Sequence, residues 1–336
     1  MNSLNKLTVI LLSINRPNFL KRAVNYWKNR ECNIIILDGS NTPIDIQFPE
    51  KKFNYFNFNM TFLERIEFAI KKIETKYCVL AADDDFHFYD GLNDYINFLE
   101  DNDDYLSCIG KSLSFNVYKG KLFYNETYPY IYANNDKENA TERINYLSEY
   151  YIPVSIYSVM LSENWISIWN SILKNQIGVW GEIEIQFEII SAYMGKRKII
   201  NKISWLRSNE ENSVSSNDKS LSGTHFIDWW KGNTIKQKEY CINLQNLINK
   251  YDNNLSSDIF NFLNEYSNKK KPQINKFQNI IKNFIPDKIK DSIASYIGIK
   301  FKDIESIEKY YKKENTTLYK DDFVSIDKLI REFNDV

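Results

Sequence analysis

The chain has 336 residues, of which 43% are hydrophobic and 26% charged, and its formal net charge is −1 at pH 7. This length and apolar content suffice for one large core, or for a core with a smaller appendage. The near-zero charge argues against a nucleic-acid-binding protein, because such proteins need a surplus of Lys and Arg to neutralise phosphates.

The first hundred residues alternate between predicted strands and helices. Pro17 stands where a first helix begins, and Thr61 is the expected N-cap of a second. Strands that alternate with helices predict a mostly parallel sheet with both faces covered. We expect strands at residues 7–13, 33–37, 53–58 and 77–82, and helices at residues 17–27 and 62–73.

The pattern is more varied after residue 90. Alternating aromatic and polar residues predict a hairpin over residues 112–132 that turns at residues 119–121. The polar stretch 209–222 has no apolar period and predicts a loop. We also expect a strand at residues 105–109 and helices at residues 91–99, 142–150, 162–173 and 184–193.

Beyond about residue 234 the composition changes, and Lys, Asn, Ile and Leu dominate. We therefore expect a main α/β domain at residues 1–233 and a helical C-terminal region at residues 234–336, with a linker at residues 268–272. Apolar residues separated by lysines recur at helical intervals over residues 277–299. This segment is either part of a helical appendage or a surface helix that rests on an anionic membrane.

Targeting and redox features predict a cytosolic protein. Residues 1–12 lack the long apolar stretch and cleavage site of a signal peptide, and no window approaches 18 uninterrupted apolar residues. Widely separated cysteines are typical of reduced structural thiols rather than of zinc ligands or disulfides. They are Cys32, Cys78, Cys108 and Cys241.

The most informative segment is residues 79–88, where an apolar run ends at three consecutive carboxylates, Asp83, Asp84 and Asp85. Adjacent carboxylates repel one another by roughly a few kcal/mol, so a cation is expected beside them, and a divalent metal is the simplest one. A solvated Asp-rich turn is the alternative. We favour a ligand site, because open α/β sheets bind ligands at strand ends.

Three segments resemble family-2-like glycosyltransferases with the GT-A fold. They are Thr-Val-Ile-Leu-Leu-Ser-Ile-Asn-Arg-Pro-Asn-Phe-Leu at residues 8–20, Ile-Leu-Asp-Gly-Ser at residues 36–40, and Ala-Asp-Asp-Asp-Phe at residues 82–86. The last is similar to the hallmark motif (DXD type) of a bacterial subgroup. The resemblance implies a Rossmann-like sheet flanked by helices, and sugar transfer from a nucleoside-diphosphate sugar to a glycan acceptor in bacterial surface-polysaccharide synthesis.

The resemblance also implies roles for single residues at the donor site. Asp85 would coordinate Mn²⁺ or Mg²⁺ on the diphosphate, with Asp83 beside it as a second ligand or near the ribose, and Asp84 in a supporting position. The family position of Asp38 accepts a hydrogen bond from the nucleotide base, although an aspartate there can also stabilise the turn. Asn15 and Arg16 lie in the loop that lines the nucleotide pocket in this family.

An inverting transferase needs a base that takes the proton of the acceptor hydroxyl. Family members carry a carboxylate at a helix start after the sheet, and the comparable segment here is Val-Trp-Gly-Glu-Ile-Glu at residues 179–184. Glu182 is the favoured base and Glu184 the second candidate, while Trp180 is placed to stack on the acceptor sugar. The alternative is that these carboxylates only stabilise the helix dipole.

Three further residues are candidates for the site. His225 follows the polar loop where many GT-A enzymes supply a further metal ligand, whereas His87 alternates with Phe86 and Phe88 and is expected to point away. Arg207 is a candidate phosphate clamp.

The implied partners are a nucleotide-sugar donor and a glycan or lipid-linked glycan acceptor, with the enzyme at the inner face of the membrane if its C-terminal helices touch lipid. Two alternatives remain. A nucleotidyltransferase is disfavoured, because the first loop, Ser-Ile-Asn-Arg-Pro, lacks the glycines of a phosphate-binding loop. A non-catalytic glycan-binding or scaffold protein with the same fold is the other.

Overall fold

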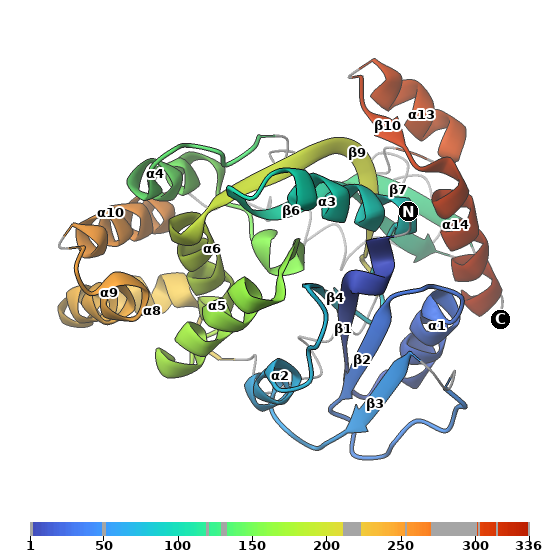
Figure 1. Ribbon diagram of the computed structural model, residues 1–336, viewed down its shortest axis with the longest axis horizontal. Helices are drawn as coiled ribbons and strands as arrows, with labels where there is room; N and C mark the ends of the chain where they lie inside the picture. Colours follow the sequence, from blue (N-terminus) through green and yellow to red (C-terminus); the bar gives the residue numbers. More distant parts are fainter. Residues whose placement is uncertain are drawn as a thin grey trace, which may run out of the picture.

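The computed structural model describes residues 3–48, 52–118, 121–128, 133–210, 223–252, 254–269, 301, 303–313 and 315–334. Ten strands in this part of the chain form one sheet, in the order β10-β9-β6-β8-β4-β1-β2-β3, with β5 paired to β9 and β7 to β6. In Figure 1, α1 and α14 lie side by side at the right of the sheet, and α4, α8, α9 and α10 gather at the left.

Parallel pairing dominates the sheet: β1 pairs with β2 and β4, β2 with β3, β6 with β9, and β9 with β10. The short β8 is antiparallel to both of its neighbours, β4 and β6. The strands are β1 Leu7–Ser13, β2 Asn33–Asp38, β3 Phe53–Asn57, β4 Tyr77–Ala82, β5 Phe86–His87, β6 Tyr105–Tyr118, β7 Lys121–Glu126, β8 Val159–Leu161, β9 Lys196–Ser208 and β10 Thr317–Leu318.

The α-helices cover both faces of this sheet. They are α1 Pro17–Trp27, α2 Phe62–Ile70, α3 Tyr89–Asp101, α4 Ala140–Tyr150, α5 Ser162–Lys174, α6 Glu182–Met194, α8 Phe226–Gly232, α9 Thr234–Asn249, α10 Leu255–Asn268, α13 Ile304–Lys312 and α14 Lys320–Asn334. Two short 3-10 helices, η1 Ser3–Lys6 and η2 Ser155–Tyr157, complete the set in the described residues.

Two hydrophobic cores lie on opposite faces of the sheet. Along β1, Val9 and Leu11 belong to the core beneath α1, α3 and α14, whereas Ile10 and Leu12 belong to the core beneath α2, α5 and α6. Successive residues of a strand point to opposite faces, so a strand buried on both faces needs an uninterrupted apolar run. This explains why β1, β2 and β4 could be predicted from their sequences.

The sequence prediction of a mostly parallel α/β fold is confirmed. Every element predicted up to residue 101 is found, although α2 ends at Ile70 instead of residue 73 and the short β5 was not predicted. Thr61 caps α2 with a full capping box formed with Glu64. The predicted hairpin is formed by β6 and β7, although residues 119 and 120 of its turn lie outside the described residues. Most of the predicted loop 209–222, linker 268–272 and helix 277–299 also lies outside them.

Strand β9 was not predicted, although it pairs with β5, β6 and β10. Its first half carries Lys196, Arg197 and Lys198, which hide the apolar run typical of a buried strand. Arg197 is nevertheless buried, because its guanidinium pairs with Glu188 at 2.7 Å. A tertiary ion pair thus makes a basic residue compatible with a strand that is paired on both sides.

The C-terminal region contributes to both sides of the molecule. Helices α8, α9 and α10 pack together and against α4 and α5, whereas β10 extends the sheet and α14 packs on α1. Figure 1 shows α14 beside α1, far from the orange helices α9 and α10. The domain boundary after residue 233 stays a prediction.

Membrane and thiol features complete the description. Within the described ranges, no helix has the length and apolarity that crossing a bilayer requires. All four cysteines are buried and unpaired, and burial raises the pKa of Cys32 and Cys78 to about 12. These thiols are therefore protonated at neutral pH.

Replacing Phe323 by Ala tests whether α14 is part of the main core. The Phe323 ring is fully buried, with its centroid 5.0 Å from that of Tyr124 and 5.9 Å from that of Phe88. Loss of this ring should lower the free energy of unfolding by about 3–5 kcal/mol, measured by urea denaturation. The neighbouring Val324 is 46% exposed, so Val324→Ala is the control and should change stability by less than about 0.5 kcal/mol.

Candidate functional site

The three consecutive aspartates form the loop between β4 and β5, near the middle of the sheet. Asp83 is completely buried, and Asp84 and Asp85 are each only 7% exposed. The alternative of a solvated Asp-rich turn is therefore excluded. Buried carboxylates need hydrogen bonds or cations, and both are present around this loop.

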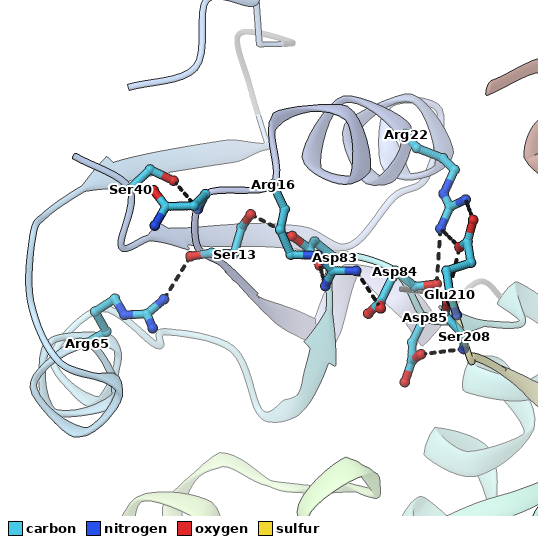
Figure 2. A network of polar contacts seen from close by, with 11 residues as sticks. Ser13, Arg16, Arg22, Ser40, Arg65, Asp83, Asp84, Asp85, Ser208 and Glu210 are labelled. Atoms are coloured by element: carbon cyan, nitrogen blue, oxygen red, sulfur yellow. Dashed lines mark hydrogen bonds and ion pairs between the residues drawn. The ribbon is translucent and has the colours of Figure 1, made fainter. Parts of the chain in front are cut away.

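Arg16 compensates the first two aspartates from the protein side. Its Nη1 donates to Asp83 Oδ1 at 2.6 Å and its Nη2 to Asp84 Oδ2 at 2.7 Å, and its side chain is 1% exposed. Ser13 Oγ donates to the second oxygen of Asp83 at 2.6 Å. Figure 2 shows Arg16 reaching from the start of α1 to Asp83 and Asp84. Burial still raises the pKa of Asp83 above its ordinary value.

A second arginine joins the acidic loop to the end of β9. Arg22 Nη2 donates to Glu210 Oε2 at 2.6 Å and reaches the backbone oxygen of Asp84 at 3.5 Å. Ser208 Oγ donates to the same Glu210 oxygen at 3.0 Å, and Ser208 N donates to Asp85 Oδ1 at 2.8 Å. Figure 2 shows this network closing around Asp84 and Asp85. The loop is thus held between α1 and β9.

Asp85 also lies in an environment that opposes its ionisation. Burial, and then the charge of Asp84, raise its pKa to about 8, although Arg207 and the amide of Ser208 oppose this. A cation bound beside Asp85 would relieve the repulsion and favour its ionised form.

A cavity of about 610 Å³, the large cavity, opens at this strand end. Its size is within the usual range for ligand pockets. The acidic loop, the first turn of α2, the end of β9 and the first turn of α6 all contribute to its walls. The charged lining residues include Asp84, Asp85, Glu182, Glu184 and Arg207.

The structure gives the two predicted catalytic glutamates different surroundings. The Glu182 carboxylate accepts hydrogen bonds from the backbone amides of Ile177 and Gly178 at 2.9–3.1 Å, and from Gln186 Nε2 at 2.7 Å. These bonds tie the carboxylate of Glu182 to the loop before α6.

Glu184 lies on a different part of the same helical turn and lines the large cavity. Burial, and then the charge of Glu188, raise its pKa from an ordinary 4.5 to about 7. A general base is most effective when its pKa is close to the working pH. The surroundings of Glu184 therefore suit proton transfer better than those of Glu182.

Asn15 and Asp38 do not line the large cavity. Asp38 Oδ1 accepts from Ser40 N at 2.9 Å, and its Oδ2 accepts from Tyr55 OH at 2.8 Å, so Asp38 stabilises its own turn. Asn15 N donates to Ser40 Oγ at 2.7 Å and Asn15 has a φ of 54°. Both residues nevertheless belong to adjoining loops at the carboxyl ends of β1 and β2, where a nucleotide site is expected.

The two histidines lie outside the acidic loop's cavity. His87, which was expected to point away from the site, is fully buried and stacks on Trp205 with ring centroids 5.7 Å apart, and burial lowers its pKa to about 4. His225 caps α8 through Nδ1, which accepts from Ile227 N at 3.1 Å. Its ring lines a second, smaller cavity.

The predicted metal ligands Asp83, Asp85 and His225 are not brought together. In the described part of the chain no group of three or more His, Cys, Asp or Glu side chains is arranged to hold a metal ion. Both oxygens of Asp83 are engaged by Arg16 and Ser13. Asp84 and Asp85 are the motif residues that line the large cavity.

Sequence reasoning missed Arg22 and Arg65 as organising residues. Arg65 Nη1 donates to the backbone oxygens of Ser13 at 2.9 Å and Leu37 at 3.1 Å, which joins the ends of β1 and β2. A signal for Arg65 existed, because it lies on the apolar face of α2 at helical spacing from Phe62. Arg22 gave no such signal, because its partner Glu210 is 188 residues away.

Comparisons with known proteins identify the fold. No protein-family model matches the chain, and no curated protein matches it. Among solved structures, S. aureus TarS 1–349 in complex with UDP-GlcNAc is 12% identical, with a TM-score of 0.52 over 84% of this chain and 76% of that one. This chain has a GT-A fold.

Two further TarS structures are less similar in shape. S. aureus TarS 1–349 is 10% identical, with a TM-score of 0.45 over 78% of this chain and 89% of that one. S. aureus TarS is 11% identical, with a TM-score of 0.43 over 78% of this chain and 54% of that one. The expected GT-A architecture is confirmed by the first comparison, and the assignment to the family-2-like subgroup stays a prediction.

Replacing Arg16 by Ala tests the internal compensation of the acidic loop. Asp83 would remain buried without its cation, so the free energy of unfolding at pH 7 should fall by about 3–5 kcal/mol in urea denaturation. Lys71→Ala is the control, because Lys71 pairs with Glu67 at 3.3 Å on the surface and should contribute less than about 0.5 kcal/mol. Equal effects of the two substitutions would contradict this account.

Replacing Glu184 by Gln tests its raised pKa through stability. The folded protein holds this proton up to about pH 7 but the unfolded chain only to about 4.5, so wild-type stability falls as pH rises through this window. The substituted amide cannot ionise, so the stability of E184Q relative to wild type should rise by up to about 3 kcal/mol between pH 4 and pH 8. Urea titrations measure this, with exposed Glu67→Gln as a flat control.

Proposed function

We propose that this protein is a glycosyltransferase that moves a sugar from a nucleoside-diphosphate sugar to a glycan acceptor. The observation that carries the proposal is that Asp85 and Glu184 line one cavity at the carboxyl end of β4. A carboxylate suited to a metal-bound diphosphate and a carboxylate suited to proton transfer are the two groups that such a reaction requires.

The GT-A fold supports the donor class. TarS of S. aureus, which shares this fold, was crystallised with UDP-GlcNAc. Arg207 lines the large cavity and supplies a guanidinium suited to a phosphate oxygen. The diphosphate would lie near Arg207 and Asp85, and the nucleoside would extend toward the strand-end loops that hold Asn15 and Asp38.

The metal is part of the proposal. Asp85, with Asp84 beside it, would hold Mn²⁺ or Mg²⁺, which when bound would neutralise charge that develops on the departing diphosphate. Arg16 favours the ionised form of Asp83 and holds its carboxylate in place, and so acts as a positioning residue for the loop. Asp83 is then a structural member of the motif.

Glu184 is the base in the proposed reaction. The acceptor hydroxyl oxygen forms a bond to the anomeric carbon, the bond from that carbon to the diphosphate oxygen breaks, and the hydroxyl proton passes to Glu184. The electron pair of the broken bond stays on the diphosphate. Attack opposite the leaving group inverts the anomeric configuration.

The biological setting is inferred from the resemblance of the sequence to family-2-like glycosyltransferases. We propose a role in bacterial surface-polysaccharide synthesis in the cytosol, with a lipid-linked glycan acceptor and a peripheral membrane contact through the C-terminal region. A nucleotidyltransferase and a non-catalytic glycan-binding scaffold are the competing functions, and the assay below distinguishes all three.

Nucleotide release tests the proposal. Wild-type protein is incubated with UDP-, GDP- and CDP-sugars and Mn²⁺, and slow release of free nucleoside diphosphate is expected from one donor class. Asp85→Asn should reduce this rate by about 100-fold or more, and Glu184→Gln should reduce sugar transfer by about 10²–10⁴-fold while donor binding is kept. The exposed Asp103→Asn variant is the matched control and should behave as wild type.

The outcomes separate the alternatives. Absence of nucleotide release from every donor would indicate a binding or scaffold protein. Formation of a nucleotide sugar from a nucleoside triphosphate and a sugar phosphate would indicate a nucleotidyltransferase. Unchanged release in the presence of a chelator would remove the metal from the proposal.

A further inference from the structure

A second cavity, of about 390 Å³, adjoins the large one. Three residues line both cavities: Trp180, Gly181 and Glu184. All three belong to the start of α6 or to the residues just before it. Glu184, the proposed base, therefore stands at the junction between the two spaces.

The walls of the second cavity are rich in aromatic side chains. Trp180 is 44% exposed and lies against His225, with ring centroids 4.6 Å apart. On the other side, the rings of Tyr151 and Tyr266 lie 4.6 Å apart. Tyr128 completes the aromatic lining. An exposed indole among tyrosines offers flat apolar faces together with hydroxyl and imidazole groups.

The charge of this lining differs from that of the large cavity. Neither Lys nor Arg is found among the described residues that line the second cavity, whereas Arg207 lines the large one. The described lining itself thus offers a diphosphate no Lys or Arg, although Arg207 contacts Tyr128, one of the lining residues. A neutral ligand with one apolar face and several hydroxyl groups is the better fit, and a pyranose sugar has this chemistry.

The C-terminal region supplies part of this lining. Tyr266 comes from α10 and is held by Tyr151 and by Phe262, whose ring centroid lies 5.9 Å from its own. His225 comes from the start of α8, and its position is fixed because Trp180 N donates to Thr224 O at 3.0 Å and Phe226 N donates to Trp180 O at 2.8 Å. The cavity therefore exists only when α8 and α10 are docked.

We propose that the second cavity is the acceptor subsite, and that it binds a neutral sugar unit stacked on Trp180 and Tyr266 with its reactive hydroxyl directed to Glu184. The inference rests on the proposed function, because a cavity is an acceptor subsite only in a protein that transfers a sugar. It assigns His225 to the acceptor wall instead of the metal, and it makes α10 a determinant of acceptor choice.

Ligand-observed NMR tests the subsite directly, with a set of methyl glycosides (glucoside, galactoside and N-acetylglucosaminide) as probes. At least one probe should bind wild-type protein, and Tyr266→Ala and Trp180→Ala should each weaken this binding roughly fivefold or more. Tyr266 is the decisive position, because it lines the second cavity and not the large one. Tyr251→Ala removes an 80% exposed tyrosine elsewhere and should leave binding unchanged.

Two results would overturn the inference: no glycoside binds the wild-type protein, or binding survives Tyr266→Ala in a protein that circular dichroism shows to be folded. If Tyr266→Ala does not fold, Tyr266→Phe and Trp180→Ala decide, since the first should keep binding and the second should lose it. Displacement of the glycoside by UDP, GDP or CDP would instead assign the cavity to the donor. Nucleotide release by wild-type protein without acceptor reports separately on the proposed function.

Discussion

Three carboxylates can be buried at the end of a central strand only when cations or hydrogen-bond donors are held against them, and the rest of this site depends on how that is done. Arg16 and Arg22 both come from the loop and helix that follow β1, so the first helix must dock correctly before the acidic loop is stable. The same arginines leave Asp85 facing the cavity with its charge uncompensated by a direct ion pair in the described residues. The same contacts that bury the loop thus leave Asp85 at the cavity wall, which is the position that the proposed metal site requires.

At the start of α6, two glutamates that are close in sequence likewise have different surroundings. Glu182 and Glu184 are two positions apart on a helix, so their side chains do not share a face. The carboxylate of Glu182 accepts hydrogen bonds from amides of the preceding loop, and these bonds position Trp180. Glu184 lies between the two cavities. Gly181, with a φ of 83°, lets the chain turn between the loop and the helix. The loop geometry therefore decides which glutamate is available for a reaction.

The C-terminal region has two separate tasks in this architecture. Helix α14 covers one core beside α1, where Phe323 and Ile330 are fully buried, and β10 extends the sheet at β9. Helix α10 packs against α4 on the other side and brings Tyr266 to the second cavity. The C-terminal region, whose composition differs from the rest of the chain, thus contributes both to the stability of the sheet and to the lining of a candidate binding surface.

The sequence by itself determined the alternation of strands and helices, the position of the acidic motif at a strand end and the short list of carboxylates, because these depend on local periodicity and on neighbours in the chain. Only the tertiary structure decided that Asp83 turns to Arg16, that Glu182 binds its own loop, that His225 lies away from the motif and that β9 joins the sheet between β10 and β6. Each of these depends on partners distant in sequence or on the path of a loop, such as the contact between Arg22 and Glu210. Local patterns carry no information about such partners, and so they fix the strand ends but not the direction of each side chain.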